Sequence, residues 1–67
     1  MPANIHFRAM TPEGELCGVA QSNDTFMVAL FDKSEKPLAP PVVFQGAQAR
    51  SQAARLAGQL TGRKVSF

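Results

Sequence analysis

The segment from residue 25 to residue 31 constrains the fold most, because it is apolar on both sides of an extended backbone. Side chains of a strand alternate between its two faces. One face carries Phe26, Val28 and Leu30, and the other carries Met27, Ala29 and Phe31. A strand of this kind is typical of the centre of a sheet whose two faces are both covered.

Two further strands are expected before this segment. In the first, residues 4–10, strict alternation places Ile5, Phe7 and Ala9 on one face and Asn4, His6 and Arg8 on the other. The second covers residues 15–20 and is weakened by Gly18, where a bulge or a close backbone contact is expected. Residues 11–14 and 21–24 have the Pro, Gly, Asn and Asp content of tight turns.

The second half of the chain predicts one helix. Three prolines in residues 36–41 indicate an extended surface loop, and residues 42–44 follow as a short strand or as an anchor for that loop. From about residue 46 to residue 61 the apolar spacing becomes helical, and Gly62 is expected to cap the helix in the left-handed conformation. The stripe on the buried side consists of Ala49, Ala53, Leu56, Ala57 and Leu60.

Residues 64–67 are expected to return as a short edge strand, with Val65 and Phe67 facing inward. The sequence therefore predicts a single α+β domain, residues 1–67, in the order β-β-β-α-β. In this fold one helix packs on one face of a small antiparallel sheet.

One helix can cover only one face of the sheet, so an apolar patch is expected on the other face. Such patches on small proteins usually contact another molecule. Met27 and Phe31 are expected there together with Cys17 and Val19. A strip of small residues on the helix either packs on the sheet or receives a partner helix. The candidate protein interface therefore comprises Met27, Phe31, Val19, Ala47, Ala54 and Gly58.

The charge is unevenly distributed along the chain. Seven Lys and Arg residues against five Asp and Glu residues give a net charge of +2, and residues 45–67 carry four cations and no acid. The excess of cations suits either an anionic partner or the dipole of the predicted helix. Candidate nucleic-acid contacts are His6, Arg8, Arg50, Arg55, Arg63 and Lys64. The chain has no Trp or Tyr to stack on bases.

The composition excludes several classes of protein. One cysteine cannot form an internal disulfide, and one cysteine with one histidine cannot complete a four-ligand zinc site. No glycine-rich phosphate loop is present, and a chain of 67 residues leaves little room for a catalytic cleft. We therefore expect no enzymatic activity, no cofactor and no metal.

The beginning of the chain lacks the pattern of a signal peptide, and no apolar run is long enough to span a membrane. With a free cysteine, this favours a cytoplasmic protein. The expected function is that of a small protein-binding module that forms a homodimer. Such modules act as adaptors, regulators or inhibitors, including phage- or plasmid-encoded inhibitors of a host system. The alternative is a nucleic-acid-binding regulator that uses the basic last third of the chain.

Overall fold

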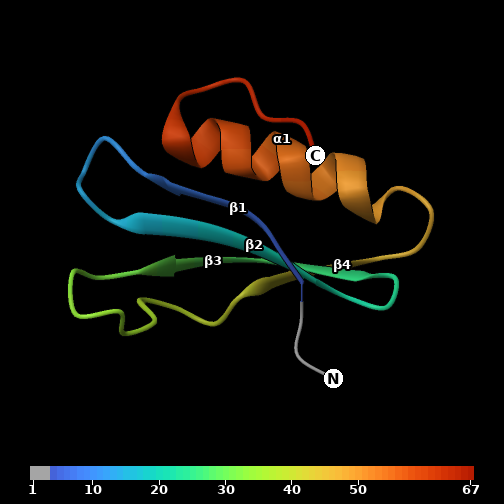
Figure 1. Cartoon of the computed structure of the whole chain (residues 1–67), viewed down its shortest axis with the longest axis horizontal. Coiled ribbons are helices and arrows are strands. Elements are labelled where there is room, and N and C mark those ends of the chain that lie inside the picture. Colours follow the sequence, from blue (N-terminus) through green and yellow to red (C-terminus); the bar gives the residue numbers. More distant parts are fainter. Residues whose placement is uncertain (1–3) are drawn as a thin grey trace.

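The computed structural model describes residues 4–67 and shows an α+β arrangement with one helix along one side of a sheet (Figure 1). The sheet contains β1 (Asn4–Met10), β2 (Leu16–Ser22), β3 (Thr25–Phe31) and β4 (Val42–Gln45), in that spatial order. Each neighbouring pair is antiparallel. The helix, α1 (Ala49–Thr61), follows the last strand. The α+β class is confirmed, but the order is β-β-β-β-α rather than the predicted β-β-β-α-β.

The two predicted turns join the first three strands. In the first, the Gly14 N–H donates to the carbonyl of Thr11 over 3.0 Å, and Gly14 has the positive φ of 87° that suits glycine. The second is a two-residue hairpin loop in which Asn23 has a φ of 57°, a conformation that asparagine tolerates well. These short connections make β1, β2 and β3 a meander with β3 inside the sheet.

The proline-rich connection between β3 and β4 stays close to the sheet. Its turn forms around Asp32, and Pro37 and Leu38 then lie beside the end of β3, where the Leu38 N–H donates to the Leu30 carbonyl over 2.9 Å. Proline has no N–H to donate, so it suits a strand position only at the edge of a sheet. This segment and β4 together form that edge.

The core lies between the sheet and α1, and small side chains on the helix allow close packing. Ala49, Ala53 and Ala57 are fully buried, as the helical spacing predicts, while Leu56 and Leu60 are half-buried beside them. From the sheet, the core receives Cys17, Val19, Phe26 and Val28. The helix ends as predicted at Gly62, whose φ is 69°.

The predicted orientation of β2 is wrong. Val19 and Cys17 do not accompany Met27 on the uncovered side, because the register pairs Val19 with Val28 and Cys17 with Leu30. Directly opposed residues of an antiparallel pair share one face of the sheet. Val19 and Cys17 therefore point at the helix and are fully buried.

The predicted edge strand at residues 64–67 is absent, and this segment belongs to the helix layer instead. Val65 and Phe67 do face inward, and they pack against the core. The Phe67 ring lies near Phe7 of β1, at a centroid distance of 6.4 Å, while α1 contacts β2, β3 and β4. The segment thus covers the part of the sheet that the helix leaves free, so it packs on β1 rather than pairing with a strand.

An irregularity in β1 overturns the strict alternation predicted for that strand. The register shifts between Ile5 and Phe7, which is the mark of a β-bulge. His6 consequently lies on the helix side with Phe7, and its ring stacks on those of Phe26 and Phe67 at 5.5 and 5.6 Å. Arg8 lies on the other side of the sheet.

Within residues 4–67, no helix is long and apolar enough to cross a membrane. The expectation about a targeting segment rests in part on residues 1–3, which lie outside the described residues.

Candidate protein-binding face

The face of the sheet that points away from α1, here called the open face, is formed by three rows of side chains that cross the strands. The strand register defines these rows. The first apolar row contains Met10, Leu16 and Phe31. The central row contains Arg8, Gly18 and Ala29. The second apolar row contains Ile5, Ala20, Met27 and Val43.

Large apolar side chains are exposed on this face. Ile5 is 63% exposed, and Met10 and Val43 are each 51% exposed. Leu16, Met27 and Phe31 are half-buried. Burying a fully exposed side chain of this kind is worth about 1.5–3 kcal/mol, and each of these partly exposed side chains can contribute a part of that amount. The open face therefore provides a substantial driving force for covering it.

The middle of the open face is hollowed. A hollow of about 430 Å³ lies over the central row and is bordered by both apolar rows and by Pro41. Gly18 lies in its floor, next to Ala20 and Ala29, so the floor consists of the smallest side chains on this face. The volume is within the range of small ligand sites, about 300–1,000 Å³, and the hollow is partly open to solvent.

Gly18 is not required by the backbone of the isolated chain. Its φ is not in the left-handed region, and a Cβ added there would meet the Phe31 ring at 3.7 Å, an ordinary contact. Glycine inside a strand lowers stability and often marks a place where another group approaches closely. The stability of the isolated chain would therefore favour a larger residue than glycine at position 18, on the floor of the hollow.

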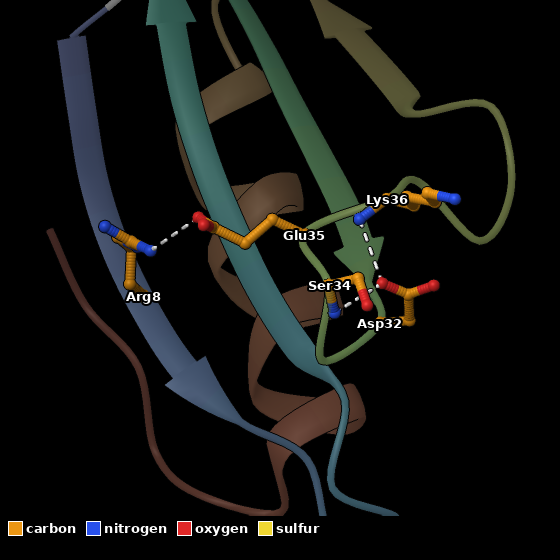
Figure 2. A network of polar contacts seen from close by, with 5 residues as sticks. All are labelled: Arg8, Asp32, Ser34, Glu35 and Lys36. Carbon is orange, nitrogen blue, oxygen red and sulfur yellow. Dashed lines mark hydrogen bonds and ion pairs between the residues drawn. The ribbon is translucent and has the colours of Figure 1, made fainter.

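One ion pair crosses the hollow. Arg8 extends from β1, and Glu35 extends from the turn after β3 and reaches over β2 toward it, with α1 behind the sheet (Figure 2). The Arg8 Nη2 and the Glu35 Oε1 are 4.0 Å apart, and the two side chains are 60% and 79% exposed. A pair this long and this exposed contributes at most about 1 kcal/mol to stability.

The turn that carries Glu35 is well defined by backbone contacts. The carboxylate of Asp32 accepts hydrogen bonds from the N–H groups of Ser34 and Lys36, over 2.8 and 2.9 Å (Figure 2). Glu35 itself has a φ of 63°, which is uncommon for this residue type. This arrangement directs the Glu35 carboxylate over the sheet and not into the solvent beyond the turn.

The structure separates the residues of the predicted protein interface. Met27 and Phe31 lie on the open face, whereas Val19 is in the core. Ala47 is exposed beside α1, and Ala54 is half-buried next to it. Gly58 faces the segment that follows the helix, and a Cβ added at Gly58 would lie 2.9 Å from the Arg63 carbonyl oxygen. The small strip on the helix is therefore partly covered by the chain itself.

The candidate nucleic-acid contacts are divided between the two sides of the molecule. Arg50 and Arg55 border a shallow hollow beside Phe67 on the helix side, and the Arg50 guanidinium lies 5.3 Å from the Phe26 ring centroid. Arg63 and Lys64 are exposed after the helix ends. His6 is held among aromatic rings, with its Nε2 2.6 Å from the Gln21 Oε1. Arg8, on the open face, cannot join a site with them.

No constellation for chemistry appears in the described part of the chain. Cys17 is buried between the sheet and α1. This burial raises the pKa of its thiol and so disfavours the reactive thiolate. Residues 4–67 hold no cluster of three or more side chains suited to bind a metal ion.

Several residues of the open face were missed at the level of sequence. Leu16, Gly18 and Ala20 would have been assigned correctly if the alternation of β2 had been placed one residue earlier, but Gly18 interrupts that alternation. Glu35 offered no signal, since a charged turn residue looks the same whether it faces solvent or bends over a sheet.

Comparisons of the chain with protein-family models, with curated proteins and with solved structures find no match.

Proposed function

We propose that this protein is a small protein-binding module and that the open face of its sheet is the binding surface. The observation that carries the proposal is the exposed apolar surface around the central hollow, with Ile5, Met10 and Val43 each at least half exposed. Contiguous apolar surfaces of this kind on small domains are typical of interaction sites. Such a module acts by occupying a surface, as an adaptor, a regulator or an inhibitor.

The arrangement of the face supports binding to a protein in preference to a small molecule. A small ligand is usually enclosed over most of its surface, whereas this hollow in the sheet is partly open to solvent. Met10 and Val43, each 51% exposed, do not line the hollow, so a ligand confined to the hollow would leave them in water. A partner surface can cover both rows together.

The test compares two variants that carry the same new charge on opposite sides of the molecule. Ile5→Lys adds a cation to the open face, and Gln52→Lys adds one to the exposed side of α1. Both side chains are exposed, so both variants are expected to fold, which circular dichroism checks. Tagged proteins are used to capture partners from a lysate of the source cells. Loss of a retained protein with Ile5→Lys but not with Gln52→Lys supports the proposal. Identical retention by both variants contradicts it.

A second candidate function is binding of nucleic acid by the helix side. It is favoured by the position of Arg50 and Arg55 beside one hollow, in a part of the chain with four cations and no acid. Phosphate contacts would make that binding strongly dependent on salt. It is the weaker candidate because His6 is engaged by Gln21 and Arg8 lies on the opposite face.

A further inference from the structure

We infer that the partner covering the open face is a second copy of this chain, with the two sheets face to face and a two-fold axis parallel to the strands. This inference rests on the proposed function and identifies the partner. It depends on the distribution of charge on the open face, on the pattern of its rows and on its area.

The charge on the open face is self-complementary. The hollow is bordered by one cation, Arg8, and one anion, Glu35, and the remaining side chains around it are uncharged. A face with no net charge does not select a strongly acidic or strongly basic partner. A two-fold interface places the same surface on both copies, so each group meets the group related to it by the symmetry axis.

The direction of the ion pair determines the direction of the axis. Arg8 and Glu35 face each other across β2, so the line between them runs across the strands (Figure 2). An axis in the interface that crosses the strands would put Arg8 opposite the Arg8 of the second copy. An axis parallel to the strands and passing near Gly18 puts each Arg8 opposite the second copy's Glu35. Only the second arrangement brings together opposite charges.

The same axis matches the apolar rows. Rotation about a line parallel to the strands leaves the position of each row along the strands unchanged, so each apolar row meets its copy. The two central hollows then face each other, and their shared space receives two arginines and two glutamates. Two sheets related in this way pack with nearly aligned strands, which is a common geometry of β-sandwiches.

The ion pair of a single copy can accept these additional contacts. A guanidinium offers five N–H donors and a carboxylate accepts several hydrogen bonds, yet the two groups are 4.0 Å apart, beyond hydrogen-bond distance. Their exposed fractions, 60% and 79%, show that most of this capacity faces solvent. Contacts with the second copy would satisfy both groups in an environment that excludes water.

The area of the face sets the strength of the dimer. About an axis near Gly18, β1, β2 and β3 overlap their copies, and β4 extends beyond them. Three strands of seven residues, at about 3.3 Å per residue and about 4.8 Å between strands, cover about 330 Å². Two such faces bury roughly 700 Å², below the usual size of a stable interface. The dimer therefore forms at high protein concentration and dissociates on dilution.

Sedimentation equilibrium of the purified protein between about 10 μM and about 1 mM tests this inference through charge exchange. Arg8→Glu and Glu35→Arg each place like charges opposite one another in the dimer, so each variant alone is expected to self-associate about tenfold more weakly or worse. An equimolar mixture of the two variants restores opposite charges across the interface. Its association is expected to return to within a few-fold of the wild type.

Arg55→Glu is the control, since it makes the same exchange on the exposed side of α1 and is expected to leave association unchanged. A wild type that stays monomeric over the whole range would overturn the inference, as would a mixture that associates no better than its components. Capture of a foreign protein that Ile5→Lys abolishes would still support the proposed function in that case. The two ideas can therefore fail separately.

Discussion

Replacing Gly18 with alanine should make the isolated chain more stable. The residue lies in the interior strand β2, has no positive φ, and an added Cβ would meet only the Phe31 ring, at an ordinary 3.7 Å. Glycine in the middle of a strand costs about 0.5–1 kcal/mol relative to alanine. Gly18→Ala should therefore raise the free energy of unfolding by about 0.5–1 kcal/mol, which corresponds to a Tm higher by roughly 2–8 °C in a domain of this size.

The larger variant Gly18→Val should separate stability from binding. Its side chain fills the floor of the hollow beneath Arg8 and Glu35, so self-association should weaken even though the monomer is no less stable. Urea unfolding followed by circular dichroism, at a concentration where the chain is monomeric, measures the first effect. Sedimentation equilibrium measures the second.

A glycine with a different role provides the matched control. Gly14 has a φ of 87°, so Gly14→Ala should destabilise the chain by about 1 kcal/mol while leaving association alone. A loss of stability in Gly18→Ala like that in Gly14→Ala would contradict this role of Gly18. Association of Gly18→Val as strong as that of the wild type would contradict the role of the hollow in binding.

Three further predictions concern the helix, the buried thiol and the basic residues. Leu56→Ala, which truncates a half-buried side chain at the edge of the core, should cost about 1–2 kcal/mol, whereas Gln52→Ala should change stability by less than about 0.5 kcal/mol in the same urea titration. Burial raises the pKa of the Cys17 thiol above its ordinary value of 9.0, so the unfolded chain loses the thiol proton at a lower pH than the folded chain. The free energy of unfolding should therefore fall as pH rises above about 9. When that free energy is measured against pH, Cys17→Ala should show a smaller fall. Wild-type protein should not bind a DNA or RNA oligonucleotide in fluorescence anisotropy at about 50 mM salt. Salt-dependent binding would instead favour the second candidate function. In that case, exchanging the exposed cations Arg55, Arg63 and Lys64 for glutamine should lower the slope of log affinity against log salt by about 2–3.

Local patterns predicted most of the elements, because each pattern reflects a short-range constraint. The doubly apolar β3, the turns with Pro, Gly and Asn, and the alanine stripe of α1 all appear at the expected residues. The orientation of β2 was not predictable in the same way, since Gly18 and Ala20 are too small to mark a face. Its register is fixed by pairing with β3, which is a contact between distant residues.

The remaining errors also arose from contacts that cross the fold. The bulge in β1 that turns His6 toward the helix is linked to ring packing with Phe26 and Phe67, far along the chain. Residues 64–67 have the alternation of a strand, but they fill a gap in the helix layer that only the finished packing reveals. For the candidate site, Met27 and Phe31 were assigned from sequence, whereas Glu35 depended on the path of one turn.

The central claim is that the chain binds a second copy of itself through the open face and not through the helix side. Amide chemical shifts recorded by NMR during dilution from about 1 mM to about 20 μM test it residue by residue. We expect concentration-dependent shifts at Gly18, Ala20 and Ala29, with none at Gln52 and Arg55 on the exposed side of α1. Shifts confined to the helix side, or no shifts anywhere across this range, would contradict it.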